Sequence, residues 1–125
     1  CRIVAGKREK LHLGNISIRR DWGWAPEYVE AMWRMLQQDK PDDFVIATGA
    51  CHSLEEFIKA AFDAAGLDWR EHVVHDDALL RPTDLMVGRG NPAQAAKLLG
   101  WQARYRMPDV VRMMVEAQRT PDAPL

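Results

Sequence analysis

Cysteine, net charge and long apolar runs are all scarce in this sequence. Cys1 and Cys51 are the only two cysteines in 125 residues, too few for a disulfide scaffold, so a reducing cytoplasm is the expected compartment. A formal net charge of −1 gives no broad surface for polyanions, so we expect no nucleic-acid partner. No apolar run approaches the length of a membrane span, so we expect no membrane partner.

Several catalytic motifs are missing as well. Neither Tyr28 nor Tyr105 is followed by lysine four residues later, so the Tyr-x-x-x-Lys base of short-chain dehydrogenases is lacking. No serine lies in a nucleophile elbow, and the histidines and cysteines lack zinc-ligand spacing. Residues 88–93 (GRGNPA) match the dinucleotide pattern G-x-G-x-x-A. The match is weak, because no second strand with a ribose-binding acid follows it.

The patterning that is present predicts one α/β domain over residues 1–125, since this length suits one small domain. Apolar and β-branched runs predict short strands, of which residues 44–49 (FVIATG) are expected to be buried. Helical periodicity predicts three to four helices, and residues 119–125 are expected to be a flexible tail. The predicted strands cover residues 11–13, 44–49, 73–74 and 85–87, and the predicted helices cover residues 26–38, 54–65, 92–99 and 108–118.

Local signals support these helices. Ser53 and Glu56 have the spacing of a capping box, Gly66 and Gly100 are expected C-terminal stops, and Asn91 is an expected N-cap. The first helix has apolar residues at amphipathic spacing: Tyr28, Val29, Met32, Trp33, Met35 and Leu36.

The chain begins with Cys1 instead of methionine, and residues 1–10 are typical of the end of a helix. We therefore expect a portion of a longer protein, although ordinary processing also produces such a start.

The segment RRDWGWAPEYV, residues 19–29, gathers arginines, an aspartate and tryptophans before a helix. Most surface arginines are solvated and contribute little, which is the expectation for Arg19. For Arg20 we consider phosphate binding, because flanking tryptophans would screen it and Asp21 would orient its guanidinium for a bidentate contact. Arg81 lies in a second loop before a strand.

The longer run LHLGNISIRRDWGWAPEYVEAMWRMLQQDKPDDFVIATGACHSLEEFI, with the later RPTDLMVGRGNPAQAAKLLGW, resembles the C-terminal part of GDP-mannose 4,6-dehydratases. The similarity extends from about residue 2 to residue 118. It implies the small substrate-binding domain of an extended short-chain dehydrogenase, without the N-terminal Rossmann domain that carries the catalytic residues and binds NADP. No catalytic residue, cofactor or metal is therefore expected on this chain.

The resemblance also implies a function and a set of site residues. The parent enzyme would be a cytoplasmic, NADP-dependent lyase that converts GDP-mannose to GDP-4-keto-6-deoxymannose, on the route to GDP-fucose, and would form a homo-dimer or tetramer. Arg20 and Arg81 would hold the diphosphate, Asp84 would accept hydrogen bonds from the ribose hydroxyls, and Asn15 would lie near the nucleotide. This chain alone would be inactive.

The chain also departs from the family pattern. Trp24 replaces a tyrosine, Asp84 replaces a glutamate, and Leu85-Met86 replaces Val-Asp, which puts the ribose contact in question more than the phosphate contacts. Two alternatives remain. One is the substrate domain of another nucleotide-sugar epimerase or reductase, and the other is a non-catalytic binding or assembly module.

Overall fold

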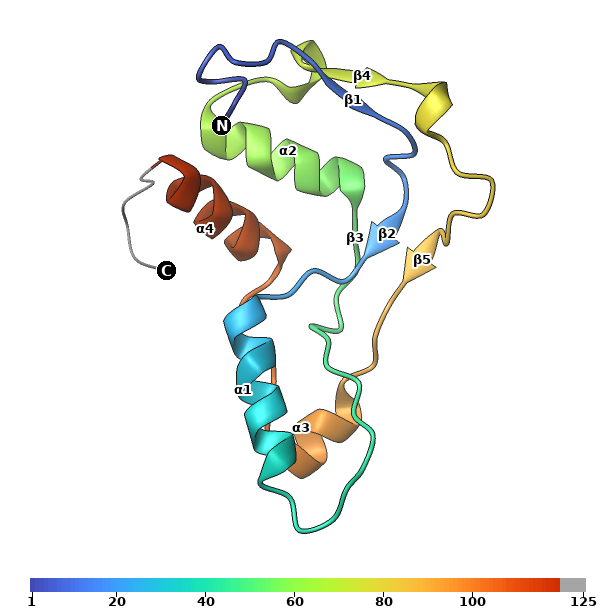
Figure 1. Ribbon diagram of the computed structural model, residues 1–125, viewed down its shortest axis with the longest axis vertical. Coiled ribbons are helices and arrows are strands. Elements are labelled where there is room, and N and C mark those ends of the chain that lie inside the picture. The colour runs from blue at the N-terminus through green and yellow to red at the C-terminus, as the bar shows by residue number, and fades with distance from the viewer. Residues whose placement is uncertain (120–125) are drawn as a thin grey trace.

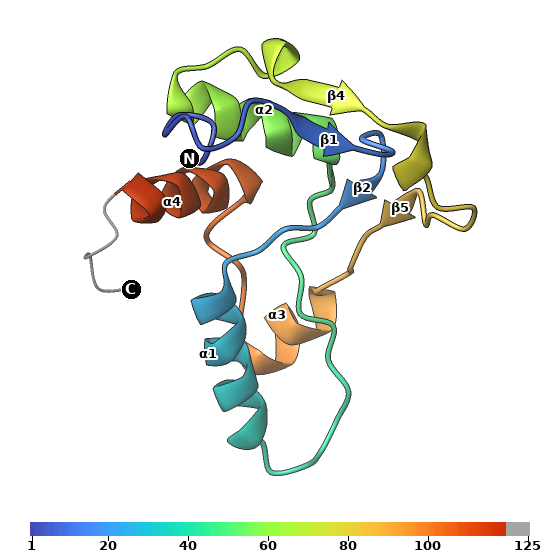
Figure 2. The same cartoon turned by 45° about the horizontal axis from the view of Figure 1, so that its top comes forward.

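The computed structural model describes residues 1–119 and arranges them as two groups of elements (Figure 1). One group holds α2, α4, β1 and β4, the other holds α1 and α3, and the short strands β2, β3 and β5 lie between them (Figure 2). The elements are β1 (Leu11–Leu13), β2 (Arg19–Arg20), α1 (Ala25–Leu36), β3 (His52–Ser53), α2 (Leu54–Ala65), β4 (Val73–His75), β5 (Val87–Gly88), α3 (Ala93–Leu99) and α4 (Met107–Arg119), with 3₁₀ turns at Trp69–Glu71 and Asp77–Leu79.

Two small sheets connect segments that are distant in sequence. β1 pairs with β4 in parallel. β2 is central in the other sheet, antiparallel to β3 and parallel to β5. In this register Arg20 lies opposite both His52 and Gly88. The central position of β2 therefore places the arginine pair where three segments meet.

Helix α2 has the predicted ends. The Ser53 side chain accepts a hydrogen bond from the amide of Glu56, whose side chain accepts one from the amide of Ser53, and Gly66 ends the helix in the left-handed conformation at φ 73°. Ile58 and Phe62 are buried, and α2 packs along α4. The capping box is thus confirmed, and it fixes the point where β3 becomes α2.

A second core joins α1 and α3. Its buried members are Ala31, Ala95, Leu99, Trp101 and Ala103, and Tyr28, Met35, Phe44 and Ile46 pack against them. The Tyr28 and Trp101 rings meet edge to face with centroids 5.9 Å apart, a favourable aromatic geometry. Trp101, which is only 2% exposed, is the centre of this core.

The prediction of a strand at residues 44–49 is wrong for this chain. The segment passes the core in a non-helical course but joins neither sheet. A strand requires a neighbour to complete its backbone hydrogen bonds. Among residues 1–119, no strand lies beside this segment to do so.

The outer side of α1 also differs from expectation. Tyr28 and Met35 of the predicted apolar set pack inward. The other four are exposed: Val29 by 63%, Met32 by 57%, Trp33 by 62% and Leu36 by 82%. Helix α1 is therefore apolar on two sides.

The start of α3 and the start of the predicted C-terminal tail differ from the sequence-based predictions. Pro92 is the N-cap of α3, and Asn91, predicted for that position, instead accepts a hydrogen bond from the amide of Ala93 at 3.1 Å. Of the predicted tail at residues 119–125, Arg119 ends α4, and the rest lies outside the described residues.

Gly90 gives a testable packing constraint. A Cβ at this position would lie 2.4 Å from Cβ of Ala47 and 3.2 Å from Cγ1 of Val45. We expect Gly90→Ala to lower the free energy of unfolding by about 2 kcal/mol in urea denaturation, because overpacking forces the backbone apart. Adding Ala47→Gly removes the colliding methyl group and should restore part of the loss. A double variant no more stable than Gly90→Ala would contradict this steric explanation.

Candidate functional site

Arg20 is held by backbone carbonyls and not by a carboxylate. Its Nη1 donates to the carbonyl oxygen of Arg19 at 2.8 Å and to that of Leu85 at 2.6 Å. Its Nε and Nη2 make no hydrogen bond, and it joins no ion pair, within residues 1–119. The half-buried guanidinium is thus fixed at one nitrogen and retains its charge and its remaining donors, which is suitable for binding an anion.

The sequence around Arg20 explains how this side chain is placed. β2 and β5 run in parallel, and the amide of Arg19 donates to the carbonyl oxygen of Met86 at 2.7 Å. A Cβ on Gly88 would lie 3.3 Å from Cδ of Arg20, which is tighter than most such contacts. Gly88 therefore allows the Arg20 side chain to cross the neighbouring strand.

Asn15 and Gly14 contact both ends of the loop that contains Arg81 and Asp84. A Cβ on Gly14 would lie 2.6 Å from the carbonyl oxygen of Leu79, so the chain entering the loop runs directly against this glycine. At the other end, Nδ2 of Asn15 lies 3.6 Å from Sδ of Met86. The lack of a side chain at Gly14 thus permits the close approach that brings the loop to Asn15.

The Asn15 side chain is itself ordered by a local turn. Its Oδ1 accepts hydrogen bonds from the amide of Ser17 at 2.9 Å and from the hydroxyl of Ser17 at 2.6 Å. This leaves Nδ2, the donor end, directed toward Met86. The structure therefore brings Asn15 and Arg20 to the segment that directly follows Asp84.

Arg81 and Asp84 are less constrained. Arg81 is exposed and Asp84 is half-buried. Within residues 1–119 neither makes a side-chain hydrogen bond or an ion pair, with each other or with Asn15 and Arg20. Arg81 and Asp84 are connected to Asn15 and Arg20 only because the ends of their loop contact Gly14, Asn15 and Arg20.

The predicted role of Asp21 in orienting Arg20 is wrong. Its two carboxylate oxygens accept hydrogen bonds from the amides of Thr48 (2.9 Å) and Gly49 (2.8 Å). Hydrogen bonds from backbone amides to a carboxylate are strong because the acceptor is charged. Asp21 therefore connects the end of the 44–49 segment to β2. No sequence pattern indicated this pairing, because it joins residues 27 and 28 positions apart.

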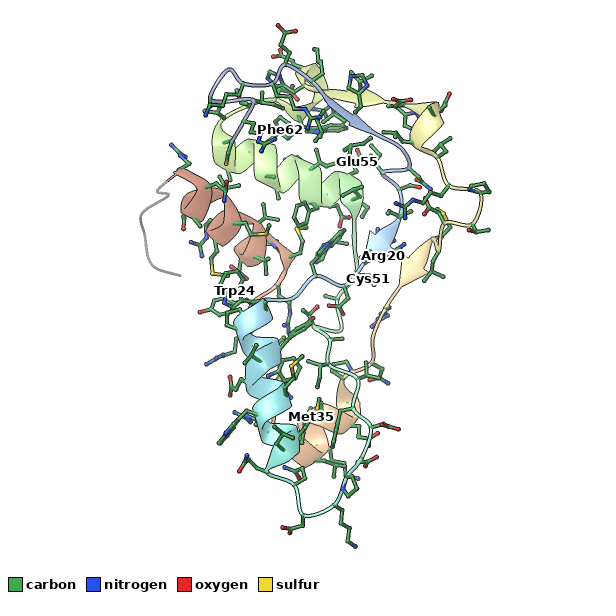
Figure 3. All side chains as sticks on the ribbon, viewed as in Figure 1. Arg20, Trp24, Met35, Cys51, Glu55 and Phe62 are labelled. Atoms are coloured by element: carbon green, nitrogen blue, oxygen red, sulfur yellow. The ribbon has the colours of Figure 1, made fainter. Side chains whose placement is uncertain are left out.

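The neighbours of Arg20 also differ from expectation. The Arg19 side chain is 42% exposed, but it is also ordered, because its Nη2 donates to the carbonyl oxygen of Cys51 at 2.8 Å. The Trp22 ring packs against Phe57, with centroids 5.0 Å apart. Trp24 lies at the start of α1, well apart from Arg20 (Figure 3). Arg20 is thus not screened by Trp24.

Arg19 also lies beside a hydrogen-bonded pair, His52 and Glu56, at the start of α2. Glu56 accepts from Nδ1 of His52 at 2.9 Å and lies 3.8 Å from Nη1 of Arg19. The bond to His52, with the Ser53 amide and Arg19, lowers the pKa of Glu56. The carboxylate is therefore negative at neutral pH and lies beside Arg19, whereas Arg20 has no carboxylate partner within the described chain.

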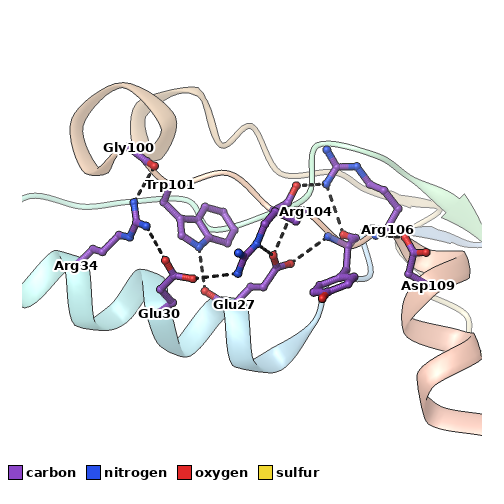
Figure 4. A network of polar contacts seen from close by, with 10 residues as sticks. Glu27, Glu30, Arg34, Gly100, Trp101, Arg104, Arg106 and Asp109 are labelled. Carbon is purple, nitrogen blue, oxygen red and sulfur yellow. Dashed lines mark hydrogen bonds and ion pairs between the residues drawn. The ribbon is translucent and has the colours of Figure 1, made fainter. Parts of the chain in front are cut away.

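Glu27 is a buried carboxylate that sequence reasoning missed (Figure 4). Its Oε1 accepts from the amide and Nε of Arg104, both at 3.0 Å, and its Oε2 accepts from the amide of Tyr105 at 3.3 Å. Burial by itself raises the pKa of Glu27, but the bonds from Arg104 and Tyr105 outweigh it and the pKa is lowered. Glu27 therefore fastens the segment after Trp101 to α1 as an anion.

The GRGNPA segment runs from the end of β5 to the start of α3. Gly88 faces the Arg20 side chain and Gly90 faces Ala47 and Val45, so both glycines permit close packing within the chain. Among residues 1–119 no three metal-ligating side chains cluster. None of the helices formed by these residues combines the length and apolar character needed to cross a membrane.

The same fold occurs in solved enzymes. RMD from Pseudomonas aeruginosa, solved in complex with NADPH, superposes with a TM-score of 0.83 at 20% identity, over 96% of this chain and 39% of that chain. The predicted small α/β arrangement of helices and short strands is thus confirmed, and the same arrangement occurs within that larger structure.

Sequence comparison is more specific. The family model described as GDP-mannose 4,6 dehydratase matches residues 1–114, and the chain belongs to that family. GDP-mannose 4,6 dehydratase 1 of Arabidopsis thaliana is 46% identical over 115 residues, 92% of this chain and 32% of that protein. The Homo sapiens GDP-mannose 4,6 dehydratase is 39% identical over 134 residues, 94% of this chain and 36% of that protein. The chain spans about a third of the length of these relatives.

Proposed function

We propose that this chain is the substrate-binding portion of a GDP-mannose 4,6-dehydratase. Arg20 and Arg81 bind the diphosphate of GDP-mannose, Asp84 binds the ribose hydroxyls, and Asn15 lies near the nucleotide. The observation that carries the proposal is Arg20, a guanidinium positioned by two carbonyl oxygens with no carboxylate partner in the described chain. The family membership gives the substrate class.

The chemistry of the parent enzyme would convert GDP-mannose to GDP-4-keto-6-deoxymannose with NADP, which supplies hydride transfer when it is bound. We assign NADP to parts of the enzyme beyond this chain, which spans about a third of the length of its relatives. Within the chain, binding energy from contacts remote from the reacting carbons would position the hexose. We therefore expect the 125-residue chain alone to be inactive. A cytoplasmic location and homo-oligomeric assembly of the parent stay predictions.

Calorimetric titration of the chain with GDP and GDP-mannose tests the proposal. A charge-assisted hydrogen bond contributes about 1.5 to 3 kcal/mol, so Arg20→Ala should weaken binding by about 10- to 100-fold. Arg81→Ala should weaken it less, because Arg81 is exposed. Arg112→Ala is the control, since Arg112 lies on α4 and pairs with Glu116.

Three results would contradict the assignment. These are a wild-type chain that binds neither nucleotide, affinities unchanged in both Arg20→Ala and Arg81→Ala, and an equal loss in Arg112→Ala. Tighter binding of UDP-glucose than of GDP-mannose would instead favour the alternative of another nucleotide-sugar enzyme.

A further inference from the structure

Met86 is fixed through its backbone, while its side chain is open to solvent. Its carbonyl oxygen accepts a hydrogen bond from the amide of Arg19 at 2.7 Å, where β5 meets β2. The preceding carbonyl oxygen, that of Leu85, accepts from Nη1 of Arg20. Met86 is nevertheless 49% exposed. Its thioether is therefore accessible to small oxidants and lies next to the residues that hold Arg20.

A hydrogen-bond donor is directed at the Met86 sulfur. Nδ2 of Asn15 donates to Sδ at 3.6 Å. Ser17 determines the orientation of the Asn15 amide group, because the backbone amide of Ser17 can only donate and therefore requires Oδ1 at 2.9 Å. The hydroxyl of Ser17 donates to the same oxygen at 2.6 Å. Nδ2 is thus held opposite Sδ by groups that do not depend on Met86.

Sulfur is a poor partner for this donor. A thioether is only a weak acceptor, whereas oxygen is the usual acceptor for an amide donor. Met32 and Met114 are exposed to similar extents, 57% and 51%. Among residues 1–119, however, Met86 is the methionine whose sulfur accepts a hydrogen bond. An oxygen atom added to this sulfur would meet a donor that is already in place.

We propose that Met86 is a reversible oxidation site and that Asn15 binds the oxidised side chain. A hydroperoxide such as hydrogen peroxide transfers an oxygen atom to Sδ. The sulfur supplies the electron pair, the O–O bond breaks and the S–O bond forms. The transferred oxygen gives its proton to the departing hydroxide, which leaves as water, so the methionine is oxidised and the peroxide is reduced. The sulfoxide oxygen then accepts the hydrogen bond from Nδ2 of Asn15, which the flexible methionine side chain reaches by rotation.

Oxidation of Met86 adds a connection to the loop that contains Arg81 and Asp84. One end of this loop already lies against Gly14. The sulfoxide bond fastens the other end to Asn15, the next residue along the chain. Within residues 1–119 the side chains of Arg81 and Asp84 have no hydrogen bond of their own. If the proposed function holds, the oxidation state of Met86 therefore determines how firmly these two nucleotide contacts are positioned.

Controlled oxidation of the 125-residue chain tests the proposal. In a chain that carries Met32→Leu and Met114→Leu, Met86 is the exposed methionine that is left in the described part, and exchange of methionine for leucine is usually tolerated. We expect dilute hydrogen peroxide to convert Met86 to the sulfoxide while the buried Met107 stays reduced. Peptide mass spectrometry measures both, and methionine sulfoxide reductase should reverse the change.

The hydrogen bond to Asn15 is tested with two variants in the same background. Asn15→Asp retains the oxygen that accepts from Ser17 and removes only the donor, and Asn15→Ala does so without adding a negative charge. Urea denaturation gives the folding equilibrium constant before and after oxidation. The ratio of the oxidised to the reduced constant should be about 2- to 10-fold larger with Asn15 than with either variant, because a single hydrogen bond has about this effect. The side-chain NH₂ resonance of Asn15 should also shift downfield on oxidation.

Three results would overturn the proposal. The first is a Met86 that stays reduced under conditions that oxidise Met32 and Met114 in the unsubstituted chain. The second is an oxidised-to-reduced ratio that is the same with and without the Asn15 side chain. The third is an Asn15 resonance that oxidation leaves unchanged. No nucleotide enters these measurements, so their failure is distinct from a failure to bind GDP-mannose.

Discussion

Trp101→Ala is expected to lower the free energy of unfolding by about 4 kcal/mol, since large-to-small substitutions of buried aromatics typically cost about 3 to 5 kcal/mol. Trp101 is almost fully buried at the centre of the α1–α3 core. Its Nε1 also donates to the carbonyl oxygen of Glu27 at 2.9 Å. The substitution therefore removes both a large apolar volume and the bond that joins the end of α3 to α1.

Urea denaturation followed by circular dichroism measures this effect. Trp101→Phe retains most of the volume and removes only the hydrogen bond, so it should cost about 1 to 2 kcal/mol. Trp33→Ala is the matched control, because Trp33 is largely exposed and surface substitutions usually stay within about 0.5 kcal/mol. Equal losses for Trp33→Ala and Trp101→Ala would show that the Trp101 core is not what stabilises the fold.

Glu27→Gln is expected to cost about 2 to 3 kcal/mol at neutral pH. Glutamine retains the shape, but its NH₂ group would face the amide of Tyr105 or the donors of Arg104, leaving buried donors unpaired. Glu30→Gln on the same helix is the control, because its ion pair with Arg34 is partly exposed and such pairs contribute about 0 to 1 kcal/mol.

The contribution of Glu27 to the free energy of unfolding should decrease at acidic pH. The pKa of folded Glu27 is lowered, so its contribution is fully present above its ordinary value of 4.5 and is lost as pH falls through that value toward the folded pKa. The stability difference between wild type and Glu27→Gln should therefore shrink below about pH 4.5. A difference that stays constant from pH 7 to pH 3 would show that the charge of Glu27 is not involved.

Features governed by nearby residues agreed best with sequence reasoning. The Ser53–Glu56 capping box and the stops at Gly66 and Gly100 are present. Each depends on contacts within a few positions along the chain. Asn91 shows the limit of such signals. Its side chain accepts a hydrogen bond from the amide of Ala93, but the N-cap is Pro92, one residue after the predicted position.

Features that depend on partners were predicted less well. The composition of residues 44–49 favours a strand, but a strand forms only when another strand completes its hydrogen bonds, and the described chain offers none. Similarly, the spacing on α1 indicated an apolar face without indicating which of two apolar sides packs inside.

The sequence by itself determined the class, the helices and the family resemblance, because periodicity, capping and motif order are local properties. It also indicated Arg20 as a candidate phosphate ligand, but only the tertiary structure decided which groups hold the Arg20 side chain. Asp21, adjacent in sequence, turns to the amides of Thr48 and Gly49, and the carbonyl oxygen of Leu85, 65 positions away, takes its place. Which donor meets which acceptor depends on how distant segments are packed, and no local pattern encodes that.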